Sequence, residues 1–201
     1  IVNKWTDLLE ETLQEVVENP HEVIYTATSP LDGTDTANRS KQTNMGELIT
    51  RSMAHAYNYK VDGALVNGGS IRIDDRLVGD ITSTDIFRVL PFGGSVLKVD
   101  LKGSLLKEIL EYGKSQSGEG AFLQHYNFSQ NSNNEWQVGE TAISDKKTYT
   151  VAFSDFLLKG LDIPFLTPEN IGVVKIYTPN ETETSADIRK TIIFYLNSLK
   201  K

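Results

Sequence analysis

The most informative stretch of this sequence is Leu65-Val66-Asn67-Gly68-Gly69-Ser70-Ile71-Arg72. In it, a short apolar strand runs directly into an asparagine, paired glycines and a single arginine. Glycines let the backbone turn tightly and expose N–H groups, and the guanidinium of Arg72 can hold a phosphate or another anion. Asn-Gly and Gly-Gly pairs are also common in hairpin turns. By itself the stretch is compatible with an anion-holding loop or with an ordinary hairpin.

The composition limits the classes of protein to which the chain can belong. Its 201 residues are enough for one substantial domain with a buried core. Cysteine is absent, which excludes thiol catalysis, cysteine zinc sites and disulfides. The net charge of −7 argues against a nucleic-acid backbone as partner, because such binding depends on clustered Lys and Arg. No apolar run has the length of a membrane span. An anionic ligand would therefore be held locally, by a few placed groups.

Apolar periodicity predicts alternating helices and strands along the chain. Helical spacing runs from Trp5 to Asn19, where Asn19-Pro20 ends it. Asn44, followed three residues later by Glu47, resembles a capping box and opens a second helix. The remaining segments are interpreted, in order, as strand 23–28, polar loop 29–40, strand 64–66, helix 83–89, strand 95–101, a helix after 103–104, strands 121–128, 135–138 and 148–153, and a last helix from about 185.

These elements favour one domain of the α/β class. Helices and strands mix throughout, without an internal repeat or a low-complexity linker. We expect an α+β mixed sheet with flanking helices over residues 21–201, preceded by a linker helix over residues 1–20. Because the chain begins at Ile1 without Met, we also expect it to be part of a longer protein.

Several short motifs occur in a fixed order around the opening stretch. They are Asn44-Met45-Gly46, Asn67 to Arg72, Gly79-Asp80-Ile81-Thr82, Leu90-Pro91-Phe92-Gly93, Leu101-Lys102-Gly103, Phe122-Leu123-Gln124 and Tyr149 to Asp162. Together they resemble the C-terminal domain of the 5′-nucleotidase family, over most of the chain from about residue 39. The resemblance implies the substrate-binding part of a two-domain phosphoester hydrolase. It further implies that an N-terminal metallophosphatase domain holds two divalent metals.

The resemblance also implies where the base and the phosphate bind. In the family two aromatic rings sandwich the base, and the matching positions here are Phe92 and Phe156. Arg39 and Arg72 would contact the phosphate, for which a guanidinium fork is well suited. A base stacked on a ring gains about 1–3 kcal/mol whatever its identity, so two rings predict a broad nucleotide binder. Without the family pattern, both rings would be interpreted as core and both arginines as solvated surface residues.

The remaining predicted site residues surround the base and the ribose. Asn67 would reach the base or lie close to it, and Gly68 and Gly69 would form one wall of the site. Asp162 would accept hydrogen bonds from the ribose hydroxyls, because a carboxylate is an acceptor only. Taken without the resemblance, Asn67 starts a turn and Asp162 is a loop residue.

The chain departs from the family pattern after the second aromatic residue. Leu161 and Ile163 occupy positions where the family has glycine, and Asp155 replaces an asparagine. If either glycine position needs a positive φ, a larger residue there is strained. We therefore expect the loop to have changed shape, and the ribose contact of Asp162 depends on that shape. Compared with asparagine, Asp155 lacks the amide N–H donor and places a negative charge near the base.

Metal ligands are the missing part of this sequence. Two-metal hydrolysis needs a cluster of Asp, His and Asn ligands. The histidines, His21, His55 and His125, are widely separated, and none lies in a metallophosphatase motif. We expect the two divalent metals to be held outside this chain, and the chain as given not to hydrolyse phosphate esters by itself.

Three functions remain open from the sequence. The first is the substrate-specificity domain of a 5′-nucleotidase or related cyclic-nucleotide phosphodiesterase. Its partners would be an AMP-like or adenosine-like ligand and an N-terminal metallophosphatase domain. The second is a stand-alone nucleotide-binding module without catalysis, and the third is an interaction domain whose altered loop has lost the site. The resemblance also implies a periplasmic, secreted or cell-surface location.

Overall fold

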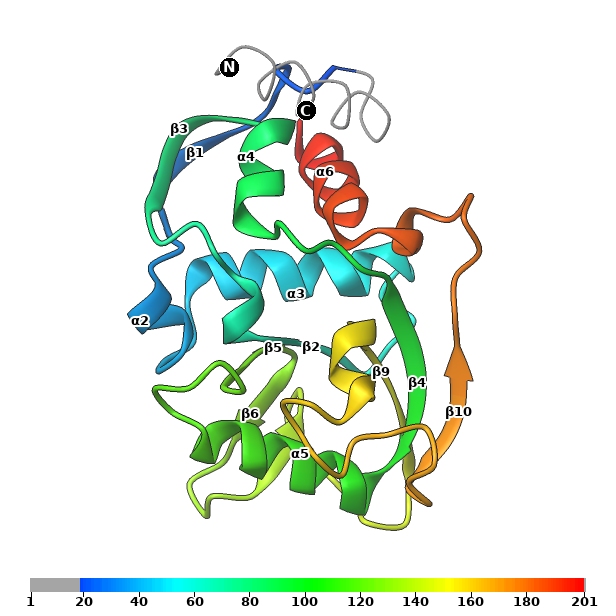
Figure 1. Ribbon diagram of the computed structural model, residues 1–201. Coiled ribbons are helices and arrows are strands. Elements are labelled where there is room, and N and C mark those ends of the chain that lie inside the picture. Colours follow the sequence, from blue (N-terminus) through cyan, green and yellow to red (C-terminus); the bar gives the residue numbers. More distant parts are fainter. Residues whose placement is uncertain (1–18, 201) are drawn as a thin grey trace.

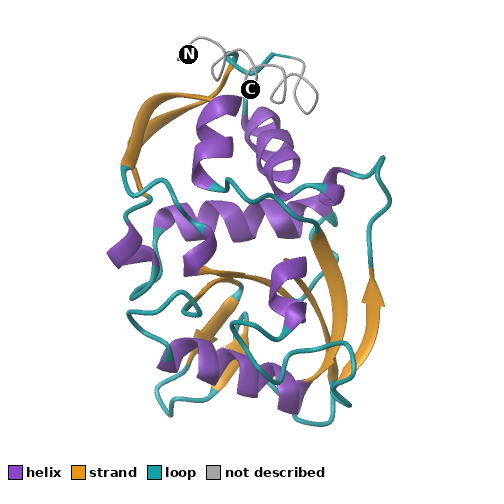
Figure 2. Ribbon diagram, viewed as in Figure 1, coloured by secondary structure: helices purple, strands orange, loops and turns teal. Residues whose placement is uncertain are grey.

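The computed structural model describes residues 19–200, and these fold into a mixed sheet with helices on both faces (Figure 1, Figure 2). This arrangement confirms the expected α/β class. The helix expected from Trp5 to Asn19 falls on residues outside the described part. It and the domain boundary at residue 20 therefore stay predictions.

The helices and strands follow one another in a mixed order. In chain order they are β1 Val23–Asp32, α2 Asp35–Asn38, α3 Asn44–Ala56, β2 Gly63–Asn67, the 3-10 helix η1 Gly68–Ser70, β3 Arg76–Thr82, α4 Ser83–Val89, β4 Val96–Lys102, α5 Gly103–Ser115, β5 Leu123–Tyr126, β6 Phe128–Gln130, β7 Trp136–Val138, β8 Thr141–Ala142, β9 Thr148–Ser154, the 3-10 helix η2 Asp155–Lys159, β10 Val173–Tyr177, the 3-10 helix η3 Thr184–Ala186 and α6 Ile188–Leu199.

The main sheet has five strands in the order β10-β4-β9-β2-β5. The neighbours β2 and β9 run parallel, and the other pairs in this sheet are antiparallel. β1 pairs with β3 in a separate ribbon, and β6, β7 and β8 form a small third sheet. β2 lies between β9 and β5, and all five of its residues are buried. The site described below forms where β2 and β9 end.

The main sheet separates two apolar cores, because successive side chains of a strand point to opposite faces. Ala64 and Val66 pack with residues of α3, α4 and α6. Leu65, between them, packs with residues of α5 and with Phe153 of β9. Figure 1 shows the same layering, with α3 on one side of the sheet and α5 on the other. Apolar residues at helical spacing in α3 and α5 thus fold onto the sheet from opposite sides.

The cap of α3 differs from the expected one. α3 begins at Asn44, as predicted, but Thr43 caps it, and its hydroxyl oxygen accepts from the Gly46 N–H at 2.9 Å. The capping box assigned to Asn44 was wrong. Its side chain turns back instead, accepting from the Asp32 N–H and donating to the Pro30 carbonyl. Both bonds hold the end of β1 against α3.

Two segments were wrongly divided by the sequence prediction. Residues 29–40, expected as a polar loop, contain the end of β1 and the short helix α2. The pairing of β1 with β3 continues to Asp32, which lies opposite Arg76. Residues 121–128, expected as one strand, contain β5 and the start of β6. The two strands separate at Asn127, which has a left-handed φ of 63°.

The predicted last helix begins later than expected, and three strands, β3, the two-residue β8 and β10, were missed. α6 starts at Ile188 because the Asp187 carboxylate accepts from the Arg189 N–H and caps the helix. β3 was not predicted because Gly79, with a φ of 77°, interrupts the alternation of apolar and polar residues along it. β10 is a short edge strand whose residues are exposed or partly exposed, so it lacks the apolar signal of a central strand.

A buried glutamine fastens the segment before α3 to the main sheet. Gln124 of β5 is 0% exposed, and its amide nitrogen donates to the carbonyls of Asn38 and Lys41 at 2.8 and 2.6 Å. Its amide oxygen accepts from the Thr43 N–H at 2.9 Å. These bonds satisfy three backbone groups that would otherwise be left without partners. They also hold Arg39, the residue after Asn38, near the end of β2.

We expect Gln124→Leu to lower the free energy of unfolding by at least about 3 kcal/mol, because each buried polar group left unpaired costs about 1–3 kcal/mol. Urea denaturation measures the change. Gln137→Leu is the matched control, since the Gln137 side chain makes a single, exposed hydrogen bond within the described part of the chain, to the Glu140 carbonyl. Its effect should stay within about 0.5 kcal/mol. Equal losses of unfolding free energy in the two variants would show that the buried Gln124 amide stabilises the fold no more than an exposed amide does.

Candidate functional site

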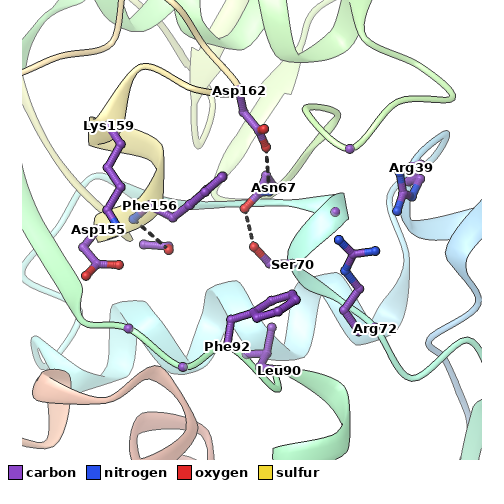
Figure 3. Close-up of a pocket in the computed structure, with 15 residues that line it drawn as sticks. Arg39, Asn67, Ser70, Arg72, Leu90, Phe92, Asp155, Phe156, Lys159 and Asp162 are labelled. Atoms are coloured by element: carbon purple, nitrogen blue, oxygen red, sulfur yellow. Dashed lines mark hydrogen bonds between the residues drawn. The ribbon is translucent and has the colours of Figure 1, made fainter.

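A cavity of about 480 Å³ lies where the parallel strands β2 and β9 end (Figure 3). Carboxyl ends of parallel strands meet at one edge of a sheet, where α/β domains commonly bind ligands. Seven of the eight residues predicted for the site line this cavity. They are Arg39, Asn67, Gly69, Arg72, Phe92, Phe156 and Asp162. The fold thus gathers residues that are far apart in the sequence.

Gly68, the eighth predicted residue, does not line the cavity. A Cβ at this position would come within 2.2 Å of the Asn38 carbonyl oxygen, so Gly68 allows η1 to pack on the segment that carries Arg39. The N–H of Gly68 bonds to the Phe122 carbonyl at 2.7 Å, and that of Gly69 bonds to the Gly120 carbonyl at 2.9 Å. These N–H groups are used within the fold. The expectation that they are exposed for an anion was wrong.

The opening stretch of the sequence is not a hairpin. β2 ends at Asn67 and is followed by η1, after which the Arg72 N–H bonds to the Val89 carbonyl at 2.9 Å. The next strand, β3, pairs with β1 and not with β2. The stretch therefore carries the chain out of the main sheet, along the cavity and towards the end of α4.

Two aromatic rings border the cavity from opposite sides. Figure 3 shows Phe156 on one side and Phe92 on the other. Phe92 is 76% exposed and belongs to neither apolar core. Large apolar side chains are more often buried. The positive φ angles of Gly93 and Gly94, 63° and 96°, turn the chain directly after it. Within residues 19–200 no ring contact joins Phe92 to Phe156.

Two arginines lie together at one end of the cavity (Figure 3). Arg39 donates from Nε to the Asp35 carboxylate at 2.8 Å, so part of its charge is already compensated. The Arg72 guanidinium lies 5.5 Å from the centroid of the Phe92 ring and forms no ion pair with any residue in the described part. Arg72 therefore has the guanidinium that is more available to an anion.

A chain of three hydrogen-bonded side chains runs along the cavity (Figure 3). The Ser70 hydroxyl donates to Asn67 Oδ1 at 2.5 Å, and Asn67 Nδ2 donates to Asp162 Oδ2 at 2.7 Å. Asn67 is only 3% exposed, so both ends of its amide need these partners. The buried amide thus holds the Asp162 carboxylate at the cavity.

The loop that carries Asp162 is not strained in the way we expected. Neither Leu161 nor Ile163 has a positive φ, and the left-handed position is Gly160, with a φ of 69°. Ile163 is fully buried in the core on the α5 side of the sheet. Burial of Ile163 anchors the loop and leaves Asp162 facing the cavity. Leu161 and Ile163 therefore do not turn Asp162 away from the cavity.

Four further polar residues line the cavity without having been predicted as site residues. They are Ser70, Ser154, Asp155 and Lys159. Ser70 belongs to the stretch from Asn67 to Arg72, and Asp155 directly precedes Phe156. Their position next to predicted site residues could have identified both as site residues. The Lys159 ammonium lies 5.8 Å from the centroid of the Phe156 ring. It follows Phe156 by three residues, which places the two on one side of a 3-10 helix.

The described residues do not fit the two divalent metals that the resemblance implies. Over residues 19–200, no group of three or more His, Asp or Glu side chains could hold a metal ion. His125 packs edge-on against Trp136 and Phe128, and burial lowers its pKa to about 4. His55 packs against rings including Phe194 and so serves the fold. In the same part of the chain no helix has the length and apolarity of a membrane span.

The fold and the cavity define a ligand-binding α/β domain, and comparison with known proteins assigns its family. Residues 23–167 match the family model for the 5′-nucleotidase, C-terminal domain. The chain belongs to this family.

Similarity to individual proteins supports this family assignment. The chain is 36% identical to bovine 5′-nucleotidase over 137 residues, which are 61% of this chain and 22% of that protein. It is 33% identical over 174 residues to the trifunctional nucleotide phosphoesterase protein YfkN of Bacillus subtilis, covering 77% of this chain and 12% of that protein. The structure of a 5′-nucleotidase precursor from Thermus thermophilus superposes with a TM-score of 0.78 at 28% identity, over 97% of this chain and 40% of that one. The chain spans less than a quarter of these curated relatives.

We expect Asn67→Asp to destabilise the domain by about 2 kcal/mol or more at pH 7, because it places a second carboxylate against Asp162. Repulsion raises the pKa of the pair in the folded state, so the folded variant binds a proton more readily than the unfolded one. The deficit relative to wild type should therefore shrink as the pH falls towards about 4. Urea denaturation at several pH values measures it. Ser70→Ala is the control, and its smaller loss of unfolding free energy should not depend on pH. If the loss in Asn67→Asp did not change with pH, the hydrogen bond between Asn67 and Asp162 would be contradicted.

Proposed function

We propose that this chain is the nucleotide-binding, substrate-specificity domain of a 5′-nucleotidase-type phosphoester hydrolase. The observation that carries the proposal is the placement of two aromatic rings, Phe92 and Phe156, across a cavity with Arg39 and Arg72 at one end. The base would lie between the rings, and the phosphate would lie at the arginines. Family membership and the names of the relatives support the same class of ligand.

The exposed ring of Phe92 is explained by this function. A phenylalanine that is 76% exposed gains little from the core, whereas a stacked base would cover its face. Each stacked ring is worth about 1–3 kcal/mol to a base of any identity. The two rings would therefore supply affinity, and the polar groups around them would set orientation.

The two arginines and Asp162 would orient the rest of the nucleotide. A guanidinium fork pairs with two phosphate oxygens and stays charged at every physiological pH. Because Arg39 already shares its charge with Asp35, Arg72 would contribute the larger part of the phosphate contact. Asp162 Oδ2 is occupied by Asn67, and the other carboxylate oxygen is left to accept from a ribose hydroxyl. The loop delivers Asp162 to the cavity, which speaks against a degenerate site.

The chain's contribution to hydrolysis would be binding and orientation. Residues 19–200 do not fit the two divalent metals, which would be held by another domain. An N-terminal metallophosphatase domain would act on the phosphate that this domain presents, and the chain alone should not release phosphate from AMP. We further propose a periplasmic, secreted or cell-surface location, in keeping with the relative named as a precursor.

We expect Phe92→Ala and Phe156→Ala each to weaken binding of AMP and of adenosine alike. The expected loss is about 1–3 kcal/mol, or five- to a hundredfold in Kd, because the lost contact is to the base. Titration calorimetry on the full chain measures both ligands. Phe194→Ala serves as control, since Phe194 is exposed on α6 and does not line the cavity. Absence of AMP binding to the wild type, or wild-type binding by Phe92→Ala, would overturn the proposed site.

Arg72→Gln should separate the phosphate contact from the base contact. We expect it to weaken AMP binding about tenfold and to leave adenosine binding nearly unchanged, because only AMP carries the phosphate. The same calorimetry provides both constants. Arg88→Gln, which removes an exposed arginine paired with Asp85, should affect neither ligand. Equal losses for AMP and adenosine in Arg72→Gln would refute the phosphate role of Arg72.

A further inference from the structure

The cavity has an acidic residue at the end opposite its arginines. Asp155 is the first residue of η2 and lines the cavity beside Phe156. Its N–H donates to the Ser95 carbonyl at 2.9 Å, which fixes its backbone next to the start of β4. Figure 3 shows Asp155 on the far side of the two rings from Arg72. A ligand that extends from Arg72 past both rings therefore ends at Asp155.

The Asp155 carboxylate is available to a ligand. It makes no hydrogen bond or ion pair with any other residue of the described chain. Lys159, which also lines the cavity, lies over the Phe156 ring and forms no ion pair with Asp155. A Cβ at position 94 would come within 2.6 Å of Asp155 Oδ1, so the absence of a side chain at Gly94 leaves room for the carboxylate where it lies.

The chemistry of a carboxylate limits what can lie in that space. An ionised carboxylate accepts hydrogen bonds and donates none, so it attracts N–H groups and repels carbonyl oxygens. An asparagine, by contrast, carries a donor and an acceptor and can turn either towards a ligand. Asp155 therefore discriminates between chemical groups that an asparagine at this position would tolerate equally.

The inference rests on the proposed function, in which the phosphate lies at the arginines and the base lies between the rings. In that orientation the edge of the base remote from the sugar faces Asp155, and its exocyclic group projects furthest towards the carboxylate. We propose that Asp155 is a specificity-determining residue, which selects 6-aminopurine and 4-aminopyrimidine nucleotides over their 6-oxo and 4-oxo counterparts. The exocyclic amino group donates to the carboxylate, whereas a carbonyl oxygen at the same place is repelled.

The test compares ligands that differ at the exocyclic group and at the neighbouring ring nitrogen, which carries a proton in IMP and UMP. A carboxylate that faces this ring N–H and not the exocyclic group would favour IMP and UMP, and that result would overturn the proposal. AMP and IMP share their sugar and phosphate, as do CMP and UMP, and titration calorimetry of the full chain gives a Kd for each. We expect wild type to bind AMP about tenfold more tightly than IMP, the usual size for a hydrogen bond to a charged group. CMP should be favoured over UMP in the same direction. In Asp155→Asn both ratios should fall to within about twofold, with AMP binding retained.

Two further variants make the outcome unambiguous. Glu169→Gln removes the same charge from an exposed side chain outside the cavity, and its AMP to IMP ratio should equal that of wild type. If Asp155→Asn unfolds, Asp155→Ser removes the charge while keeping a residue suited to a helix start. Equal binding of AMP and IMP by wild type, or an unchanged ratio in the Asp155 variants, overturns the role of Asp155 alone. Absence of all nucleotide binding to wild type overturns the proposed function itself.

Discussion

Strand β2 has neither a free edge nor a free face, and this constraint determines where the cavity forms. β9 and β5 occupy its two edges, and both of its faces are buried by the two cores. Such a strand can contribute to a binding site only at its end. Its last residue, Asn67, has its amide between Ser70 and Asp162, and the parallel strand β9 ends beside it at Ser154. The remaining cavity residues are arranged around these two strand ends.

The cavity combines an apolar middle with opposite charges at its ends. The rings of Phe92 and Phe156 border the middle, with Arg72 at one end and Asp155 at the other. Among residues 19–200, neither of these charged side chains has an ion-pair partner. The chain as a whole has a net charge of −7, so its long-range field does not attract a phosphate. Any anion must be recognised by close contact with the arginines. The buried Gln124 amide contributes indirectly, because it holds the segment that carries Arg39.

The sequence predicted the elements that have a strong apolar pattern. It did not predict the elements whose presence or start depends on strand pairing or on a helix cap. The helices α3 and α5 carry long, regular patterns and were predicted close to their observed starts, and the strand β9 was predicted close to its observed bounds. α2 has four residues, too few for a helical period, and β10 lies at a sheet edge with little apolar signal. The cap of α3 was misassigned because Thr43 and Asn44 are both good capping residues. Only the contact between Asn44 and the end of β1 distinguishes them.

The sequence by itself determined the α/β class, and the order of its motifs indicated the family and a set of site residues. Tertiary structure alone decided what the individual residues do within the fold. It showed that Gly68 packs behind the cavity while Gly69 borders it, that Ile163 anchors its loop, and that Asn67 holds Asp162. The physical reason is distance along the chain. Asn67 and Asp162 are separated by 95 residues, and a hydrogen bond between them exists only after the sheet has brought their segments together.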